Sequence, residues 1–236
     1  MEKLVFPAAD DDRGCGRRIA SDGYRVHVVS DPAADPALAT TQVLAVETEV
    51  RPYVLVGSDT GALFAAGLIA SGQVTDVDAL VLAGLPMAQE ADQAASRSGS
   101  AAAEAADGGL PGDSWEAELA ARTACPTHRG RLAGQGLRRG ALFEPIPAGW
   151  ESLADLGRLS VPVLGLHGTA DPVSPLDAVR ERYRQAPGAE LISIAGGVHD
   201  VLNDVTHRTV AATIVEFLER LRLGAELPPI AVSEKL

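Results

Sequence analysis

Two kinds of hydrophobic pattern alternate along most of the chain. Short runs rich in Val, Leu and Ile are separated by longer segments in which apolar residues recur every three or four positions. The short runs predict buried strands, and the longer segments predict helices that pack on one face. The expected strands are Lys3–Phe6, Tyr24–Val29, Tyr53–Val56, Ala79–Ala83, Val161–His167 and Glu190–Ile194. The expected helices are Gly16–Asp22, Ala37–Val50, Thr60–Ala70, Leu176–Gln185 and Arg208–Leu223. This order predicts a three-layer α/β fold with a mostly parallel sheet of about six strands.

The alternation stops in the middle of the chain. From about Met87 to Gly109 the sequence is rich in Ala, Ser, Gly and Gln and poor in large apolar residues. Short helices without a strand are expected after it: Ser114–Ala124, Arg131–Gly136 and Trp150–Leu156. This pattern predicts a helical lid inserted between two strands of the sheet. The expected organisation is a first core part (1–86), the lid (87–158), a second core part (159–225) and a frayed tail (226–236).

Composition narrows the class of protein. The chain has 236 residues, of which 46% are hydrophobic and 22% charged, and this suits one globular α/β domain with a modest insertion. The formal net charge of −12 argues against nucleic acid or an anionic membrane as the partner. Two distant cysteines make no disulfide framework, and no spacing of Cys or His indicates a metal site. Because no apolar run suits a signal peptide or a membrane span, we expect a cytoplasmic enzyme that acts on a small molecule without a cofactor. The sequence does not indicate an oligomeric state.

A strand-to-helix bend carries the most specific local pattern. The strand Tyr53–Val56 passes directly into the helix Thr60–Ala70. Gly57 and Gly61 lie two residues on either side of Asp59. This arrangement is typical of a nucleophile elbow, G-x-Nuc-x-G, which projects its central side chain from the carboxyl end of the sheet. The same residues also suit an ordinary helix-capping turn, because Ser and Asp are common N-caps. The bend alone leaves both interpretations open.

Two later strands end in residues that complete a pattern. Asp171 follows the strand Val161–His167, and His199 follows the strand Glu190–Ile194 after a Gly-Gly loop. A nucleophile, an acid and a histidine in this order, each just past a strand, are arranged as in α/β-hydrolases. The chain therefore resembles the α/β-hydrolase superfamily over essentially its whole length, and most specifically between residues 161 and 223.

That resemblance implies a fold and a set of roles. It implies a reduced α/β-hydrolase fold with Asp59 in the nucleophile position, His199 as base and Asp171 as the orienting acid. It also implies an oxyanion hole, for which the backbone N–H groups of Thr60 and Ala8 are the candidates. The chain departs from the family pattern in two ways. We expect no counterpart of the two strands that usually precede the first central strand, and the His-Gly that usually follows that strand is absent after Phe6.

An Asp at the nucleophile position changes the chemistry that the bend suits. A carboxylate displaces a leaving group from a saturated carbon well, and water activated by His199 can then cleave the alkyl ester on Asp59. A serine would form an ether at the same carbon, which water does not readily break. In this respect the chain resembles the epoxide hydrolase and haloalkane dehalogenase branch of the superfamily.

The lid offers four candidates for the substrate pocket. Trp115 and Trp150 carry indole N–H groups that suit a halide, and buried packing is the alternative. His128 and Arg129 suit a substrate carboxylate or a proton transfer to a leaving oxygen, and structural hydrogen bonding is the alternative. Epoxide hydrolases usually present lid tyrosines to the opening oxygen, but the tyrosines of this chain all lie outside the lid.

Two other functions stay open. One is an esterase, thioesterase or lactonase-like enzyme, in which Asp59 acts as a base, forms a mixed anhydride or replaces a native Ser. The other belongs to a different class: a non-hydrolytic catalyst (cyclase, lyase or isomerase) or a ligand-binding module on the same fold. Hydrolysis of p-nitrophenyl esters favours the first, and a reaction without ¹⁸O uptake from water favours the second.

Overall fold

The six strands expected from the sequence form one parallel sheet in the computed structural model, which describes residues 3–7, 13–46, 49–87, 114–134 and 137–234. Hydrogen bonds join the strands in the order β2-β1-β3-β4-β5-β6, and every neighbouring pair is parallel. The strands are β1 (Lys3–Pro7), β2 (Arg25–Val29), β3 (Tyr53–Ser58), β4 (Ala79–Ala83), β5 (Val163–Gly168) and β6 (Ala189–Ile194). The predicted parallel α/β architecture is confirmed.

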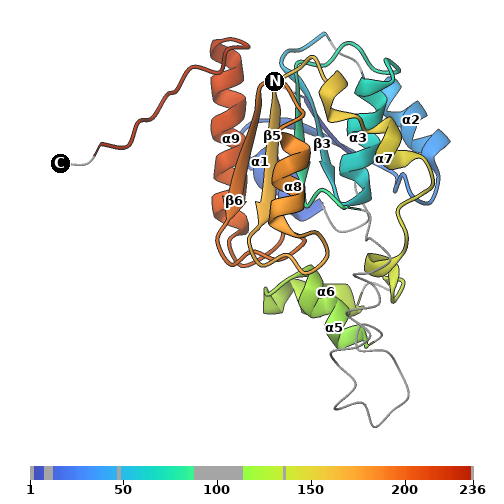
Figure 1. Cartoon of the computed structure of the whole chain (residues 1–236). Coiled ribbons are helices and arrows are strands. Elements are labelled where there is room, and N and C mark those ends of the chain that lie inside the picture. The colour runs from blue at the N-terminus through green and yellow to red at the C-terminus, as the bar shows by residue number, and fades with distance from the viewer. Residues whose placement is uncertain (1–2, 8–12, 47–48, 88–113, 135–136, 235–236) are drawn as a thin grey trace.

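Helices cover both faces of the sheet, as Figure 1 shows. The first and last helices pack on one face, and three others pack on the opposite face. The first group is α1 (Arg13–Ser21) and α9 (His207–Leu223), and the second is α2 (Pro36–Leu44), α3 (Thr60–Ala70) and α8 (Leu176–Tyr183). In α9 the buried stripe is Val210, Ile214, Phe217 and Leu221. This spacing places one apolar side of the helix against the sheet.

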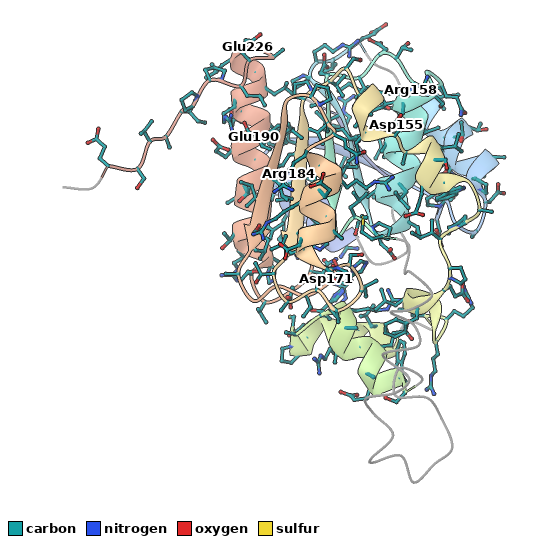
Figure 2. All side chains as sticks on the ribbon, in the orientation of Figure 1. Asp155, Arg158, Asp171, Arg184, Glu190 and Glu226 are labelled. Carbon is teal, nitrogen blue, oxygen red and sulfur yellow. The ribbon has the colours of Figure 1, made fainter. Side chains whose placement is uncertain are left out.

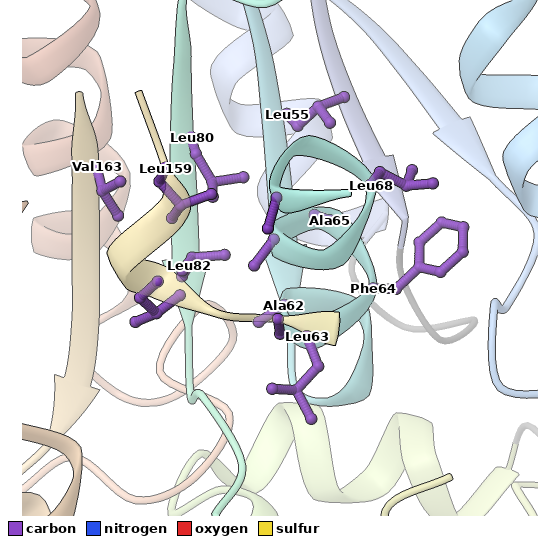
Figure 3. Packing of buried hydrophobic residues seen from close by; sticks show 14 of the residues in the cluster. Leu55, Ala62, Leu63, Phe64, Ala65, Leu68, Leu80, Leu82, Leu159 and Val163 are labelled. Atoms are coloured by element: carbon purple, nitrogen blue, oxygen red, sulfur yellow. The ribbon is translucent and has the colours of Figure 1, made fainter. Parts of the chain in front are cut away.

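The central strands send side chains into both layers. In β4, Leu80 and Leu82 are buried in the cluster that includes α3, whereas Val81 is buried in the cluster that includes α9. Figure 3 shows Leu80 and Leu82 beside Ala62 and other residues of α3. Small residues on α3 let the helix lie close to the sheet. The packing therefore fixes α3, and with it the bend from which α3 starts.

Part of the lid segment covers the carboxyl end of the sheet. The helices α5 (Trp115–Arg122) and α6 (Pro126–Gly134) lie beyond the strand ends in Figure 1. The chain then returns to β5 through η1 (Ala141–Phe143), α7 (Trp150–Leu153) and η2 (Leu156–Arg158). Ser114 caps α5, because its hydroxyl accepts a hydrogen bond from the N–H of Ala117 at 3.1 Å. Residues 88–113 lie outside the described part, so the bounds of the lid stay a prediction.

The two largest differences between expected and observed helix bounds are at α6 and α2. The helix expected at Arg131–Gly136 begins five residues earlier, at Pro126, because proline suits the first turn, where its missing N–H costs no hydrogen bond. The helix expected at Ala37–Val50 ends at Leu44, before a segment with β-branched residues that disfavour helix. None of the described helices has the length and apolar character needed to cross a membrane.

The final segment follows α9 as irregular chain. Its beginning is held to the domain, because the carbonyl oxygen of Leu227 accepts hydrogen bonds from Nη2 of Arg220 at 2.7 Å and from Nε at 3.1 Å. Leu227 itself is buried. Beyond it the described chain extends away from α9 in Figure 1.

Candidate active site

The bend between β3 and α3 is strained at Asp59. Its backbone has φ 52° and ψ −131°, a conformation that costs an L residue about 1–3 kcal/mol. The N–H of Asp59 donates to the carbonyl of Ala83 in β4 at 3.0 Å, and its carbonyl accepts from the N–H of Ala62 at 2.8 Å. A Cβ on Gly57 would lie 2.3 Å from the carbonyl oxygen of Gly61, so only glycine fits there. The bend is thus held by its neighbours and presents the side chain of Asp59 at the start of α3.

Three residues from separate loops meet at this end of the sheet. Nδ1 of His199 lies 2.9 Å from Oδ2 of Asp171, and Nε2 lies 3.4 Å from Oδ1 of Asp59. Because a carboxylate only accepts, Nδ1 carries the proton of the shorter contact. The longer contact is an ion-pair distance without a well-aligned hydrogen bond. Figure 2 labels Asp171 at the end of the sheet that faces α5 and α6. The structure therefore brings together the residues that the sequence proposes as nucleophile, base and acid.

Burial and charge act in opposite directions on His199. Burial alone would lower its pKa, but the hydrogen bond to Asp171 and the carboxylate of Asp59 outweigh burial and raise the pKa to about 10. The pKa of Asp171 is lowered, because the hydrogen bond and the charge of His199 outweigh the effect of burial. At neutral pH, His199 is therefore an imidazolium that lies between two carboxylates.

A cavity of about 420 Å³ opens beside Asp59. One wall is the bend itself, with Asp59 and Thr60, and another is the segment after β4, with Pro86 and Met87. The remaining wall comes from Val173 and the returning lid segment: Ala141, Leu142, Phe143, Glu144, Pro145, Ile146, Pro147, Ala148, Gly149, Glu151 and Ser152. The cavity has the size and the mixed apolar and polar lining of a site for a small organic molecule.

The loop that carries His199 is attached to the lid by its backbone. The N–H groups of His199 and Asp200 donate to the carbonyl oxygens of Ala121 and Arg122, at 3.2 and 2.9 Å, where α5 ends. On its other side the loop lies against β4, because a Cβ on Gly84 would be 2.5 Å from the carbonyl oxygen of His199. The imidazole is thus held between the sheet and α5.

Asp204 joins the same two segments with its two oxygens. Its side chain is fully buried, and Oδ1 accepts from the N–H of Ala124 at 2.8 Å and from the hydroxyl of Thr123 at 3.2 Å. Oδ2 accepts from the N–H of Val198, next to His199, at 3.1 Å. Hydrogen bonds to backbone N–H groups stabilise a buried carboxylate, so Asp204 links the end of α5 to the histidine loop.

The oxyanion candidates have different outcomes. Thr60 is the first residue of α3 and lines the cavity, so its N–H lies at a helix start, where negative charge is stabilised. Ala8 lies outside the described residues. Its role therefore stays a prediction.

The four lid candidates do not line the cavity beside Asp59. The guanidinium of Arg139 lies 5.6 Å from the ring centre of Trp115, and the ring of Trp150 lies 5.7 Å from that of Phe64. Both tryptophans are only partly buried, and Trp150 also lines a second, smaller hollow with Phe64 and Leu153, so a role in substrate binding stays a prediction.

His128 and Arg129 contact the lid and the histidine loop. Nε2 of His128, which is buried, lies 3.0 Å from Oδ2 of Asp200. Nε of Arg129 donates to the carbonyl of Thr123 at 2.7 Å, and its Nη1 lies 3.5 Å from Glu116. These contacts match the structural alternative to substrate binding for both residues. Among the described residues, no group of three His, Cys, Asp or Glu side chains is arranged to hold a metal ion.

The fold and the meeting of these three side chains define the class of protein: the chain is a hydrolase of the α/β-hydrolase fold, similar to esterases and lipases. More specifically, residues 7–206 match the family described as serine aminopeptidase, S33, and the chain belongs to that family. No curated protein matches the chain in a direct comparison.

Solved structures of the same fold are similar over nearly the whole chain. A monoacylglycerol lipase from Paleococcus ferrophilus is 15% identical, with a TM-score of 0.61 over 92% of this chain and 93% of the lipase. An esterase from Exiguobacterium antarcticum is also 15% identical, with a TM-score of 0.62 over 93% and 92% of the two chains. A thermophilic esterase from Thermogutta terrifontis is 19% identical, with a TM-score of 0.58 over 94% and 90%. At these identities the likeness establishes the fold.

Proposed function

We propose that this hydrolase uses Asp59 as a covalent nucleophile on a small organic electrophile, such as an epoxide or an alkyl halide. The observation that carries the proposal is the position of Asp59, which lines the cavity and lies 3.4 Å from Nε2 of His199. In the first step an oxygen of Asp59 bonds to a saturated carbon of the substrate. The bond from that carbon to its leaving group breaks, and the leaving group keeps the electron pair.

The protonation of His199 fits this order of events. In the resting enzyme the imidazole is protonated, because its pKa is raised to about 10, so it is not ready to accept a proton at neutral pH. The first step needs no base, since the nucleophile is the carboxylate of Asp59. Ester formation then removes one of the two negative charges that stabilise the imidazolium. The pKa of His199 falls, and its Nε2 proton passes to the oxygen that leaves when an epoxide opens, or to solvent water when the leaving group is a halide. The neutral ring is then available for the second step.

The second step regenerates the enzyme. Water attacks the carbonyl carbon of the ester on Asp59, and Nε2 of His199 accepts the proton of that water. The N–H of Thr60, at the start of α3, is the proposed donor to the oxyanion that forms. The intermediate then expels the alcohol product, which takes a proton from His199. Asp171 keeps the imidazole oriented through the 2.9 Å bond to Nδ1.

Ester hydrolysis is the second candidate, and two observations favour it. The chain belongs to a family named for a serine enzyme, and the similar structures include esterases. In addition, no tyrosine or tryptophan is among the described residues that line the cavity, whereas halide binding and epoxide opening suit such donors. In an ester hydrolase Asp59 either forms a mixed anhydride or acts as a base. The change Asp59→Ser would then raise the rate on p-nitrophenyl acyl esters.

The position of an oxygen label separates these functions. Turnover of epoxides, haloalkanes and p-nitrophenyl esters in H₂¹⁸O is followed by mass spectrometry of the peptide that contains Asp59. Attack of water on an alkyl ester of Asp59 places ¹⁸O in the Asp59 carboxylate, and the adduct accumulates in His199→Gln. Label in an acid product alone indicates acyl chemistry in which water attacks the acyl carbon of the substrate. The absence of label from both peptide and product points to a non-hydrolytic reaction. The control is Asp177→Asn, a change at an exposed carboxylate of α8.

A further inference from the structure

A second histidine lies against the acid of the candidate site. We propose that His167 is a positioning residue for the reaction: its Nε2–H binds the turn that begins with Asp171 and lies against the same oxygen of Asp171 that His199 binds, and so fixes the direction and strength of the contact between Asp171 and His199. This inference rests on the function proposed above for Asp59 and His199. It assigns His167 no contact with the substrate.

The surroundings of His167 define its tautomer. The ring is fully buried, and Nε2 lies 2.8 Å from the carbonyl oxygen of Ser174 and 3.2 Å from Oδ2 of Asp171. Both neighbours are acceptors, so Nε2 must carry a proton. Nδ1 has no hydrogen-bond partner among the described residues. The ring is thus a neutral donor with its hydrogen directed at the turn that begins with Asp171.

Each oxygen of Asp171 has two partners. Oδ1 accepts from the N–H groups of Val173 at 2.7 Å and Ser174 at 3.1 Å. Oδ2 lies between two imidazoles, Nδ1 of His199 at 2.9 Å and Nε2 of His167 at 3.2 Å. His167 therefore acts on this turn at two places: Nε2–H donates to the carbonyl oxygen of Ser174, and the ring lies at ion-pair distance from Oδ2 of Asp171. The carboxylate cannot rotate without losing several of these contacts.

A neutral donor at this place restrains the basicity of His199. Burial lowers the pKa of His167, and the charge of His199 acts in the same direction, whereas Asp171 and the carbonyl of Ser174 oppose them. The ring stays neutral and adds no positive charge beside the imidazolium. Its N–H dipole lies 3.2 Å from Oδ2 and offsets part of the negative charge of Asp171 that acts on His199. Two carboxylates, Asp59 and Asp171, face the pair of His167 and His199, and the two imidazole rings also face each other.

Three substitutions separate the hydrogen bond from simple packing. In His167→Gln the amide nitrogen reaches the position of Nε2, so the donor is kept. In His167→Asn the amide is polar but too short to reach Oδ2, and in His167→Met the donor is lost with similar bulk. If the donor matters, Asn and Met act alike and Gln rescues. If only volume matters, Met is tolerated best.

The direct readout is the pKa of His199, measured by NMR titration of its ring. The titration is done in an Asp59→Asn background, where the pKa is expected to lie closer to neutral pH. We expect His167→Asn and His167→Met to raise the pKa of His199 by about one unit, because more of the negative charge of Asp171 then stabilises the imidazolium of His199. His167→Gln should leave it within a few tenths. An unchanged or lower pKa in His167→Asn overturns the proposal. Should the Met variant fail to fold, the Asn variant decides the outcome.

Turnover supplies a second readout in the chain that keeps Asp59. We expect His167→Asn to lower kcat by roughly tenfold with little change in KM, because the base is misdirected while the cavity is intact. His167→Gln should restore most of kcat. An Asn variant with wild-type kcat overturns the role in the reaction. Failure of the proposed function would appear differently, as the absence of ¹⁸O from Asp59, while the titration of His199 would be unaffected.

Discussion

The proposed order of steps depends on the negative charge of Asp59. The change Asp59→Asn tests the effect of that charge without requiring any turnover of substrate. The amide has nearly the shape of the carboxylate and, like an ester, carries no charge. Nε2 of His199 lies 3.4 Å from Oδ1 of Asp59. At that distance a pair of unit charges gains about 5 kcal/mol at an effective dielectric constant of 20 and about 1 kcal/mol in water. These values correspond to about 3.5 and about 1 pKa units.

The exposure of Asp59 places the expected effect between these limits. Its side chain is 31% exposed, so solvent screens part of the attraction to His199. From the value of about 10 in the unmodified chain, we expect a fall by about two units. A fall of two units raises the neutral fraction of His199 about a hundredfold at neutral pH, so the ring becomes available as a base for the second step.

Histidine NMR provides the assay. The five histidines give a simple ring spectrum, and His199→Gln identifies the resonance of His199. Titrations of the unmodified chain, Asp59→Asn and the exposed control Asp177→Asn give the pKa of His199 in each. An Asp59→Asn value equal to that of the unmodified chain refutes the charge argument. A value near 6.5 in the unmodified chain also refutes it, because the imidazolium would then not be stabilised in the resting enzyme.

Three further expectations concern stability and the lid. Gly57→Ala should lower the free energy of unfolding in urea by about 2 kcal/mol or more, because its Cβ would lie 2.3 Å from the carbonyl oxygen of Gly61; a neutral effect would contradict the tight bend. Asp204→Ala should lower kcat and speed amide hydrogen exchange at Val198, since one carboxylate joins that loop to α5; unchanged exchange would argue against the link. The raised pKa of His199 adds stability that is complete below about pH 6.5 and lost as pH rises to about 10. His199→Gln should therefore show a flatter dependence of Tm on pH across that window, and equal slopes would speak against a raised pKa.

The backbone around the site was predictable because it follows from repeated patterns. Strands of a parallel sheet end at one edge, so residues just after β3, β5 and β6 are expected to meet there. Asp59, Asp171 and His199 do meet, at contacts of 2.9 and 3.4 Å. The helix Thr60–Ala70 has the predicted bounds. The glycine bend marks its start, and its apolar sequence contains no proline that would end it early. The catalytic roles of these residues stay a proposal.

The walls of the cavity were not predictable from the same patterns. The segment from Ala141 to Gly149 lines it, but its prolines and glycines give no helical or strand period to interpret. Trp115 and Trp150 are pocket candidates by residue type, but in the structure they contact Arg139 and Phe64 and do not line the cavity beside Asp59. Residue type indicates what a side chain can do, and only tertiary packing determines what it faces.

The roles of two buried groups depend on contacts that no local pattern contains. Asp204 binds Thr123 and Ala124, about eighty positions earlier in the chain. His167 precedes Asp171 by four residues, but its approach to the oxygen of Asp171 that His199 binds is visible only in three dimensions. Both cases show that supporting groups of a site are harder to read than its central residues.

The attachment of the histidine loop to α5 constrains any attempt to enlarge the entrance for bulkier substrates. Because the amides of His199 and Asp200 bond to carbonyls of Ala121 and Arg122, trimming α5 would loosen the base together with the entrance. The segment from Glu144 to Gly149 borders the same hollow and has none of these bonds to the loop among the described residues. Redesign for access is therefore best begun at that irregular stretch, with α5 left intact as part of the machinery.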